Sequence, residues 1–145
     1  MEIDKNAPAV AREQITIQAP IEKVWQLQSD IQHWNTWQPD ISNVTVSGDL
    51  KTGTTFKWKA QGLTITSTLE VVEPPVQIGW TGVAMGMKAI HNWSFEQHDD
   101  HTHVIVEESL SGWLTRLMCL FDKNFLQKSM VKSLAVLKQQ AEKSA

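Results

Sequence analysis

From residue 41 to residue 110 apolar and polar side chains alternate with a period of two, and this pattern limits the possible folds more than any other feature of the chain. In residues 54–60, for example, Phe56, Trp58 and Ala60 alternate with Lys57 and Lys59. A period of two is typical of strands that have one buried face. The pattern predicts strands at 41–47, 54–60, 63–72, 76–83, 88–97 and 102–110. Because the turns between them are short, the sheet should be mostly antiparallel.

Different patterns precede and follow these strands. Residues 12–18 alternate as a further strand, Pro20 favours a helix that begins directly after it, and a second short helix is predicted over residues 31–37. The apolar segment 113–120 is followed, after a break near Phe121, by a long helix from Asp122, its expected N-cap, to about residue 143. The apolar stripe of this long helix consists of Leu126, Met130, Leu134, Leu137 and Ala141.

These elements together predict an α+β fold: a seven-stranded, curved antiparallel sheet wrapped round a long C-terminal helix, with two short helices between the first two strands. This arrangement is the simplest one that buries the apolar faces of the sheet and of the helix against each other. We expect a single domain over residues 1–145, in which residues 1–10 are frayed because they show no period.

Charge and composition exclude several classes of partner. The 145 residues carry 13 Lys and Arg against 16 Asp and Glu, a net charge of −3 without a basic stripe, so nucleic acid is not an expected partner. The chain has no run of about 18 apolar residues and no apolar signal segment, so we expect a cytoplasmic protein without a membrane span. The single Cys119 excludes an internal disulfide and a CxxC zinc motif. We expect a monomer or a homodimer that holds neither metal nor cofactor.

Four segments of the chain carry a resemblance to a known superfamily. They are IQAPIEKVW at 17–25, HNWSFE at 91–96, VEESLSG at 106–112 and LKQQAE at 137–142. With the order of the elements, they resemble the helix-grip fold of the START/polyketide cyclase-dehydrase superfamily, also written SRPBCC. The resemblance implies a cavity between the sheet and the long helix, open near the short helices and loops. It leaves the activity open, because this fold hosts binders, transporters and enzymes.

A histidine and a glutamate are predicted to face each other in that interior. In the hairpin of residues 88–97 and 102–110 opposed positions sum to an odd number, so His91 and Glu108 share the inward face, directly opposed or diagonal. A buried His and Glu cost much less as a hydrogen-bonded pair than alone. Such a pair can move a proton, with His91 as the base and Glu108 orienting it, or can form a polar link that binds a ligand. A β-bulge would bring Glu107 inward in place of Glu108.

The aromatic residues give the second set of candidates, since the chain has seven Trp and no Tyr. Trp58, Trp80 and Trp93 occupy inward positions on three strands, where they either fill the core or form the walls of a site for a flat molecule. The predicted ligand-binding residues are Trp34, Trp37, Phe56, Trp58, Ile65, Ser67, Leu69, Trp80, Trp93, Phe95, Val106, Trp113 and Phe121.

Two pairs of these aromatic residues are expected at the ends of the cavity. Trp34 and Trp37 fall on the second short helix, where they form either a gate to the cavity or a clamp against the sheet. Trp113 and Phe121 flank the short apolar segment and are expected to close the other end.

The sequence supports two principal functions. The first is binding of a hydrophobic, ring-containing small molecule, because aromatic side chains line the inward face. The second is a cofactor-free enzyme of the polyketide cyclase/dehydratase kind, which would use His91 and Glu108 as an acid/base pair. A third reading, a protein-interaction domain that uses the groove between sheet and helix, has less support in the sequence.

Overall fold

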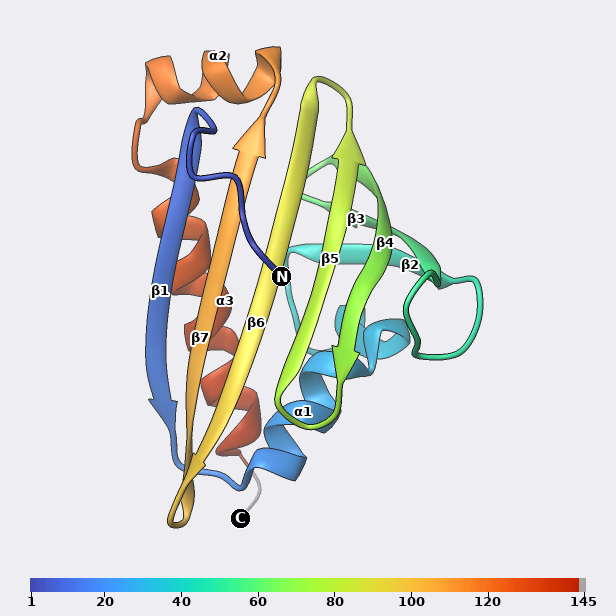
Figure 1. Cartoon of the computed structure of the whole chain (residues 1–145), viewed down its shortest axis with the longest axis vertical. Coiled ribbons are helices and arrows are strands. Elements are labelled where there is room, and N and C mark those ends of the chain that lie inside the picture. Colours follow the sequence, from blue (N-terminus) through green and yellow to red (C-terminus); the bar gives the residue numbers. More distant parts are fainter. Residues whose placement is uncertain (144–145) are drawn as a thin grey trace.

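The computed structural model describes residues 1–143, and within them a seven-stranded antiparallel sheet curves around the C-terminal helix (Figure 1). The order of the strands across the sheet is β1-β7-β6-β5-β4-β3-β2. The strands are β1 (Ala9–Ile17), β2 (Ile41–Val46), β3 (Thr55–Ala60), β4 (Leu63–Glu73), β5 (Gln77–Ala84), β6 (Met87–His98) and β7 (His101–Ser111). The predicted helix-grip fold is confirmed; residues 144–145 of the expected domain lie outside the described part.

Helices cover the concave face of the sheet. They are α1 (Ile21–Ser29), the 3-10 helix η1 (Ile31–Thr36), α2 (Trp113–Phe121) and α3 (Phe125–Ala141). Figure 1 shows α3 behind β1 and β7, α1 across the lower end of the sheet and α2 across the upper end. No helix within residues 1–143 has both the length and the hydropathy needed to cross a membrane.

The hairpin turns follow from a few residues with unusual backbone angles. Gln61 and Gly62 join β3 to β4 with φ angles of 51° and 84°, respectively. A two-residue turn with two positive φ angles has the twist that suits an antiparallel hairpin. The register on either side of this turn is regular, with Ala60 opposite Leu63.

The apolar stripe of α3 is buried as predicted. Leu126, Met130, Leu134, Leu137 and Ala141 all belong to the core, and α3 packs mainly against β1. The stripe therefore closes one half of the concave face, while the short helices α1 and η1 close the lower part of the other half.

Three local expectations require correction. The N-terminal residues are not wholly frayed, because β1 begins at Ala9 and the backbone N–H of Asp4 donates to Ser109 Oγ at 3.0 Å. The second short helix is a 3-10 helix. Asp122 is not the N-cap of the long helix, which begins at Phe125. Its carboxylate instead accepts from the Asn124 backbone N–H at 3.0 Å, which turns the chain before the helix.

The fold predicts that truncation of a side chain affects stability very differently at two positions on α3. Leu137 has no exposed surface, whereas Val131 is 50% exposed. Leu137→Ala should lower the free energy of unfolding by about 2–5 kcal/mol, because it removes buried surface and leaves a cavity. Val131→Ala, the matched control, should change it by less than about 0.5 kcal/mol. Urea denaturation measures both, and equal effects would contradict this packing.

Candidate functional site

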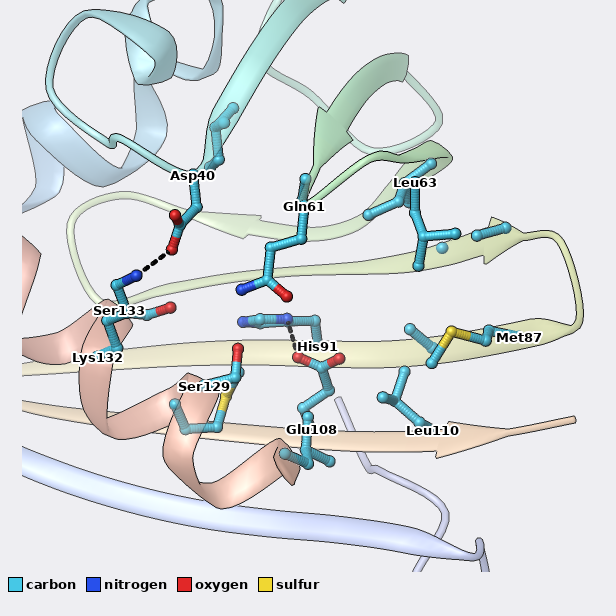
Figure 2. A pocket seen from close by; sticks show the side chains of 18 of the residues that line it. Asp40, Gln61, Leu63, Met87, His91, Glu108, Leu110, Ser129, Lys132 and Ser133 are labelled. Carbon is cyan, nitrogen blue, oxygen red and sulfur yellow. Dashed lines mark ion pairs between the residues drawn. The ribbon is translucent and has the colours of Figure 1, made fainter. Parts of the chain in front are cut away.

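A cavity of about 480 Å³ lies between the concave face of the sheet and the first half of α3. Its walls come from β3 to β7, from the segment between η1 and β2, and from the junction of α2 and α3 (Figure 2). A volume of this size is typical of small-molecule sites, which are concave and mainly apolar.

The cavity exists because the inward side chains change in size along the strands. At the lower end of the sheet the inward positions carry large side chains, among them Ile78 and Trp93, which are buried. At the upper end they carry Gly82, Ala84 and Ala89, all of which line the cavity. These small residues leave space between the sheet and α3 that side chains do not fill.

His91 and Glu108 lie at the boundary between the filled and the hollow halves. They are directly opposed across β6 and β7, and this pair of strands has a regular register, so Glu108 and not Glu107 faces His91. His91 Nδ1 and Glu108 Oε1 are 2.6 Å apart, and each residue is 8% exposed. Because a carboxylate oxygen accepts hydrogen bonds, the proton of this short contact belongs on Nδ1.

Neighbouring rings hold the imidazole in place. The His91 ring stacks on the Trp80 indole with a centroid distance of 4.7 Å and on the Trp93 indole at 5.7 Å, with interplanar angles of 18° and 12°. The second ring nitrogen, Nε2, is buried and has no hydrogen-bond partner within residues 1–143. With Nδ1 bonded to Glu108, Nε2 is the atom of His91 that remains for a ligand, since a buried polar atom without a partner is costly.

Charged side chains stand at the cavity mouth. Lys132 on α3 forms an ion pair with Asp40, which precedes β2, with Nζ and Oδ2 2.6 Å apart (Figure 2). A second ion pair, Lys128 with Asp122, joins the first turn of α3 to the end of α2 at 2.7 Å. Figure 2 also shows Gln61, which points into the cavity toward His91. The mouth is thus polar, while the interior is mainly apolar.

The structure brings only part of the predicted site together. The predicted residues that line the cavity are Trp58, Ile65, Ser67, Trp80, His91 and Glu108. The predicted residues that do not line it are Trp34, Trp37, Phe56, Leu69, Trp93, Phe95, Val106, Trp113 and Phe121. This second set divides into buried residues of the filled half and surface residues of α2.

Trp34 is the clearest example of the first kind. Of its two expected roles, the structure favours the clamp against the sheet over the gate, although Trp34 is buried and not at the surface: it is 1% exposed, and its indole N–H donates to the Gln28 carbonyl oxygen at 3.0 Å. Its ring packs against Phe56, Trp58 and Trp80 at centroid distances of 5.6, 5.5 and 5.3 Å, respectively. This packing makes it the floor beneath the two indoles that do line the cavity.

The other members of the buried group fill the lower half of the concave face. Leu69, Trp93, Phe95 and Val106 belong to the core, and Phe95 meets the edge of Trp25 on α1 at 5.9 Å. Trp37 packs against this core beside the mouth. The helices that cover this half are the reason these inward side chains meet protein and not open space.

The expectation that Trp113 and Phe121 close the cavity is not met, because both point to solvent. They are 61% and 84% exposed, respectively. The inner side of α2 instead supplies Met118 to the cavity wall.

Sequence reasoning missed the small and the helical parts of the lining. Four small residues face the same side of the sheet as the predicted tryptophans: Ala60, Gly82, Ala84 and Ala89. Their small size was the signal in the sequence that could have predicted a cavity. On α3 the missed residues include Ser129 and Ser133, whose short polar side chains face the cavity (Figure 2). Within residues 1–143 no three His, Cys, Asp or Glu side chains are grouped so that they could hold a metal ion.

Comparison with known proteins places the chain in a family. The model of the polyketide cyclase / dehydrase and lipid transport family matches residues 8–142, and the chain belongs to this family. No curated protein matches the sequence significantly.

Solved structures share the fold at low sequence identity. A hypothetical protein, jhp0584, from Helicobacter pylori superposes with a TM-score of 0.85 at 20% identity, covering 97% of this chain and 92% of that chain. The Zhui aromatase/cyclase from Streptomyces sp. R1128 gives 0.79 at 15% identity, with coverages of 92% and 93%. A START superfamily protein from Mycobacterium smegmatis gives 0.71 at 15% identity, with coverages of 94% and 99%.

The buried pair predicts energetic coupling. Glu108→Leu or His91→Phe should each lower the free energy of unfolding by about 1–3 kcal/mol, since each leaves one buried polar partner unsatisfied. The double variant should lose less than the sum, with a coupling of at least about 0.5 kcal/mol. Glu107→Leu, one position away on the outer face, is the control and should show no coupling to His91. Equal coupling energies for Glu107 and Glu108 in denaturant titrations would refute the pair.

The ion pair between α2 and α3 predicts a specific titration behaviour. The hydrogen bond from the Lys128 ammonium holds the pKa of Asp122 below its usual value, and the Lys138 ammonium does the same for Glu142. Lys128→Gln should therefore raise the pKa of Asp122 and leave that of Glu142 unchanged, and Lys138→Gln should do the reverse. NMR titration of the side-chain carboxyls measures both values; an Asp122 pKa indifferent to Lys128→Gln would show that the ion pair does not form in solution.

Proposed function

We propose that the chain binds a hydrophobic, ring-containing small molecule that carries one hydrogen-bonding group, in the cavity between the sheet and α3. The observation that supports this most directly is the buried Nε2 of His91, an atom without a partner within the described residues, on a side chain that lines the mainly apolar cavity. A ligand hydroxyl or carbonyl placed there would satisfy it, and the rings of Trp58 and Trp80 would contact the rest of the molecule.

The pair sets the polarity of this contact. When the imidazole is neutral, its one N–H is at Nδ1 and donates a hydrogen bond to Glu108. Nε2 then presents a lone pair, which accepts a hydrogen bond from a ligand hydroxyl. A protonated imidazole presents an N–H and donates to a ligand oxygen. A phenolic or enolic hydroxyl on a flat ring can satisfy both states, and so is the group that we expect on the ligand.

The proposal predicts a difference between two related probes. Beta-naphthol should bind more tightly than naphthalene, because only the hydroxyl reaches Nε2, and binding should quench the fluorescence of Trp58 and Trp80. His91→Phe should remove the preference for beta-naphthol while leaving the affinity for naphthalene similar. Ala89→Phe should weaken both ligands by at least about tenfold, because a large side chain then fills the hollow.

The matched control is Ile90→Phe, because the neighbouring residue Ile90 does not line the cavity. That variant should bind both probes as the unchanged chain does. Thermal unfolding of each variant separates loss of the site from loss of the fold. If Ala89→Phe binds both probes unchanged, or if no flat apolar compound gives saturable quenching, the proposal is wrong.

A second function, a cofactor-free cyclase or dehydratase, is favoured by the same pair. A carboxylate on Nδ1 orients the ring and makes Nε2 a base that can take a proton from the carbon alpha to a carbonyl. The test is exchange of the alpha protons of beta-tetralone in D₂O, followed by NMR. Catalysis predicts faster exchange that His91→Ala abolishes while beta-tetralone still binds. Exchange at the uncatalysed rate would leave binding as the function.

A further inference from the structure

The outward face of α2 carries large apolar side chains, whereas the outward face of a surface helix is usually polar. Trp113 is 61% exposed, and Leu120 and Phe121 are each 84% exposed. Thr115, by contrast, is fully buried, and its hydroxyl donates to the Ser111 carbonyl oxygen at 3.0 Å. A helix at a protein surface normally turns its polar side to water. The orientation of α2 therefore indicates that something other than water covers this face.

The turn between β5 and β6 extends this apolar surface. Val83 and Met85 are 56% and 71% exposed, respectively. The turn is fixed against α2, because the Leu114 backbone N–H donates to the Gly86 carbonyl oxygen at 3.0 Å. The backbones of Gly86 and Gly112 approach so closely that a Cβ on Gly112 would clash with the Gly86 backbone. The two elements form one rigid end of the molecule, at the top of Figure 1.

Positive side chains accompany this apolar end. Arg116 lies on the exposed side of α2, Lys123 follows the helix, and Lys88 stands opposite Val83 across β5 and β6. Within residues 1–143 none of the three forms an ion pair. The nearby acid in sequence, Asp122, is already paired with Lys128. This end is thus locally cationic although the whole chain carries a net charge of −3.

We propose that this end, formed by α2 and the β5–β6 turn, docks on the surface of a lipid bilayer that contains anionic lipids. A short helix with Trp, Leu and Phe on its outer side and with neighbouring Arg and Lys has the composition of helices that lie in the membrane interface. Trp favours the headgroup level, where its ring and its N–H both find suitable surroundings. The cations meet the negative potential of the lipid headgroups.

Charge argues against a second copy of the chain as the occupant. A two-fold contact through this end would place the same surface against itself, and so would bring Lys88, Arg116 and Lys123 near their own copies. The interface would then gather like charges, which disfavours association. An anionic bilayer satisfies both the apolar side chains and the cations.

Docking in this way would also place a wall of the cavity at the bilayer. Met118 on the inner side of α2, with Asp122 and Phe125 of the junction that follows, lines the cavity. The inference rests on the outer surface alone and does not require that the cavity bind any ligand.

The test is co-sedimentation of the full chain with vesicles. Vesicles made of equal parts phosphatidylcholine and phosphatidylglycerol should carry the protein down, and vesicles of phosphatidylcholine alone should carry down much less. Leu120→Ser with Phe121→Ser should weaken binding by at least about tenfold, because two interfacial apolar side chains are lost. Val76→Ser with Val131→Ser removes two exposed apolar side chains elsewhere, and this control should bind as the unchanged chain does.

Each outcome decides the proposal. Both altered sites are exposed, so each variant should fold, and circular dichroism is the check on this. No sedimentation with anionic vesicles, or equal loss in the control variant, would overturn the proposal. Sedimentation velocity without lipid supplies the remaining test. If the unchanged chain is a dimer and the variant with Leu120→Ser and Phe121→Ser is a monomer, this end serves self-association, and that result would overturn membrane docking. Loss of probe binding in the cavity with vesicle binding intact would affect only the proposed function.

Discussion

The rest of the structure depends on how one long helix covers a curved sheet. The buried stripe of α3 fits the half of the concave face formed by β1 and its neighbours, and α1 with η1 fits the lower part. Large inward side chains fill the space wherever a helix lies over them. Gly82, Ala84 and Ala89 line the cavity, and because their side chains are small the interior remains open there. The cavity is therefore a consequence of side-chain size at inward positions and needs no separate structural element.

His91 and Glu108 lie where these two halves meet, and their position determines what the cavity can do. A buried carboxylate or imidazole alone would be costly, but the contact of 2.6 Å satisfies one atom of each. The indoles of Trp80 and Trp93 fix the plane of the imidazole, so Nε2 keeps one direction. A fixed, buried polar atom without a partner within residues 1–143, on a side chain that lines the cavity, is suited to a ligand with one polar group. The same geometry would suit a general base. The chemistry of the ligand that enters the cavity would therefore decide whether the site binds only or also catalyses.

The alternation of side chains predicted much of this from sequence. It predicted the strands, the apolar stripe of α3 and the opposition of His91 and Glu108. Each of these depends on the two-residue period of a strand or the 3.6-residue period of a helix, and not on packing between elements that are distant in the sequence. It could not predict which inward residues remain uncovered. Trp93 and Trp80 face the same side of the sheet, yet only Trp80 lines the cavity, because α1 packs against the lower part of β6.

Other errors have a similar origin in packing between distant elements. Trp34 was expected as a gate or as a clamp against the sheet, and the sequence could not decide between them: its indole N–H donates to the Gln28 carbonyl oxygen and its ring packs under Trp58, as in the clamp. Trp113 and Phe121 were expected to close one end of the cavity, but α2 packs on the β5–β6 turn through Gly86 and Gly112, and this contact determines which side of α2 faces out. Neither the covering helices nor this close backbone approach is visible in a local pattern.

In the proposed function, Nε2 of His91 receives the polar group of a ligand bound between the sheet and α3. A crystal structure of the protein with bound beta-naphthol tests it most directly. We expect the ligand hydroxyl within hydrogen-bonding distance of His91 Nε2, with the naphthalene rings against Trp58 and Trp80 and the contact between His91 and Glu108 retained. A ligand bound elsewhere, or one in the cavity that leaves Nε2 without a partner, would contradict the account.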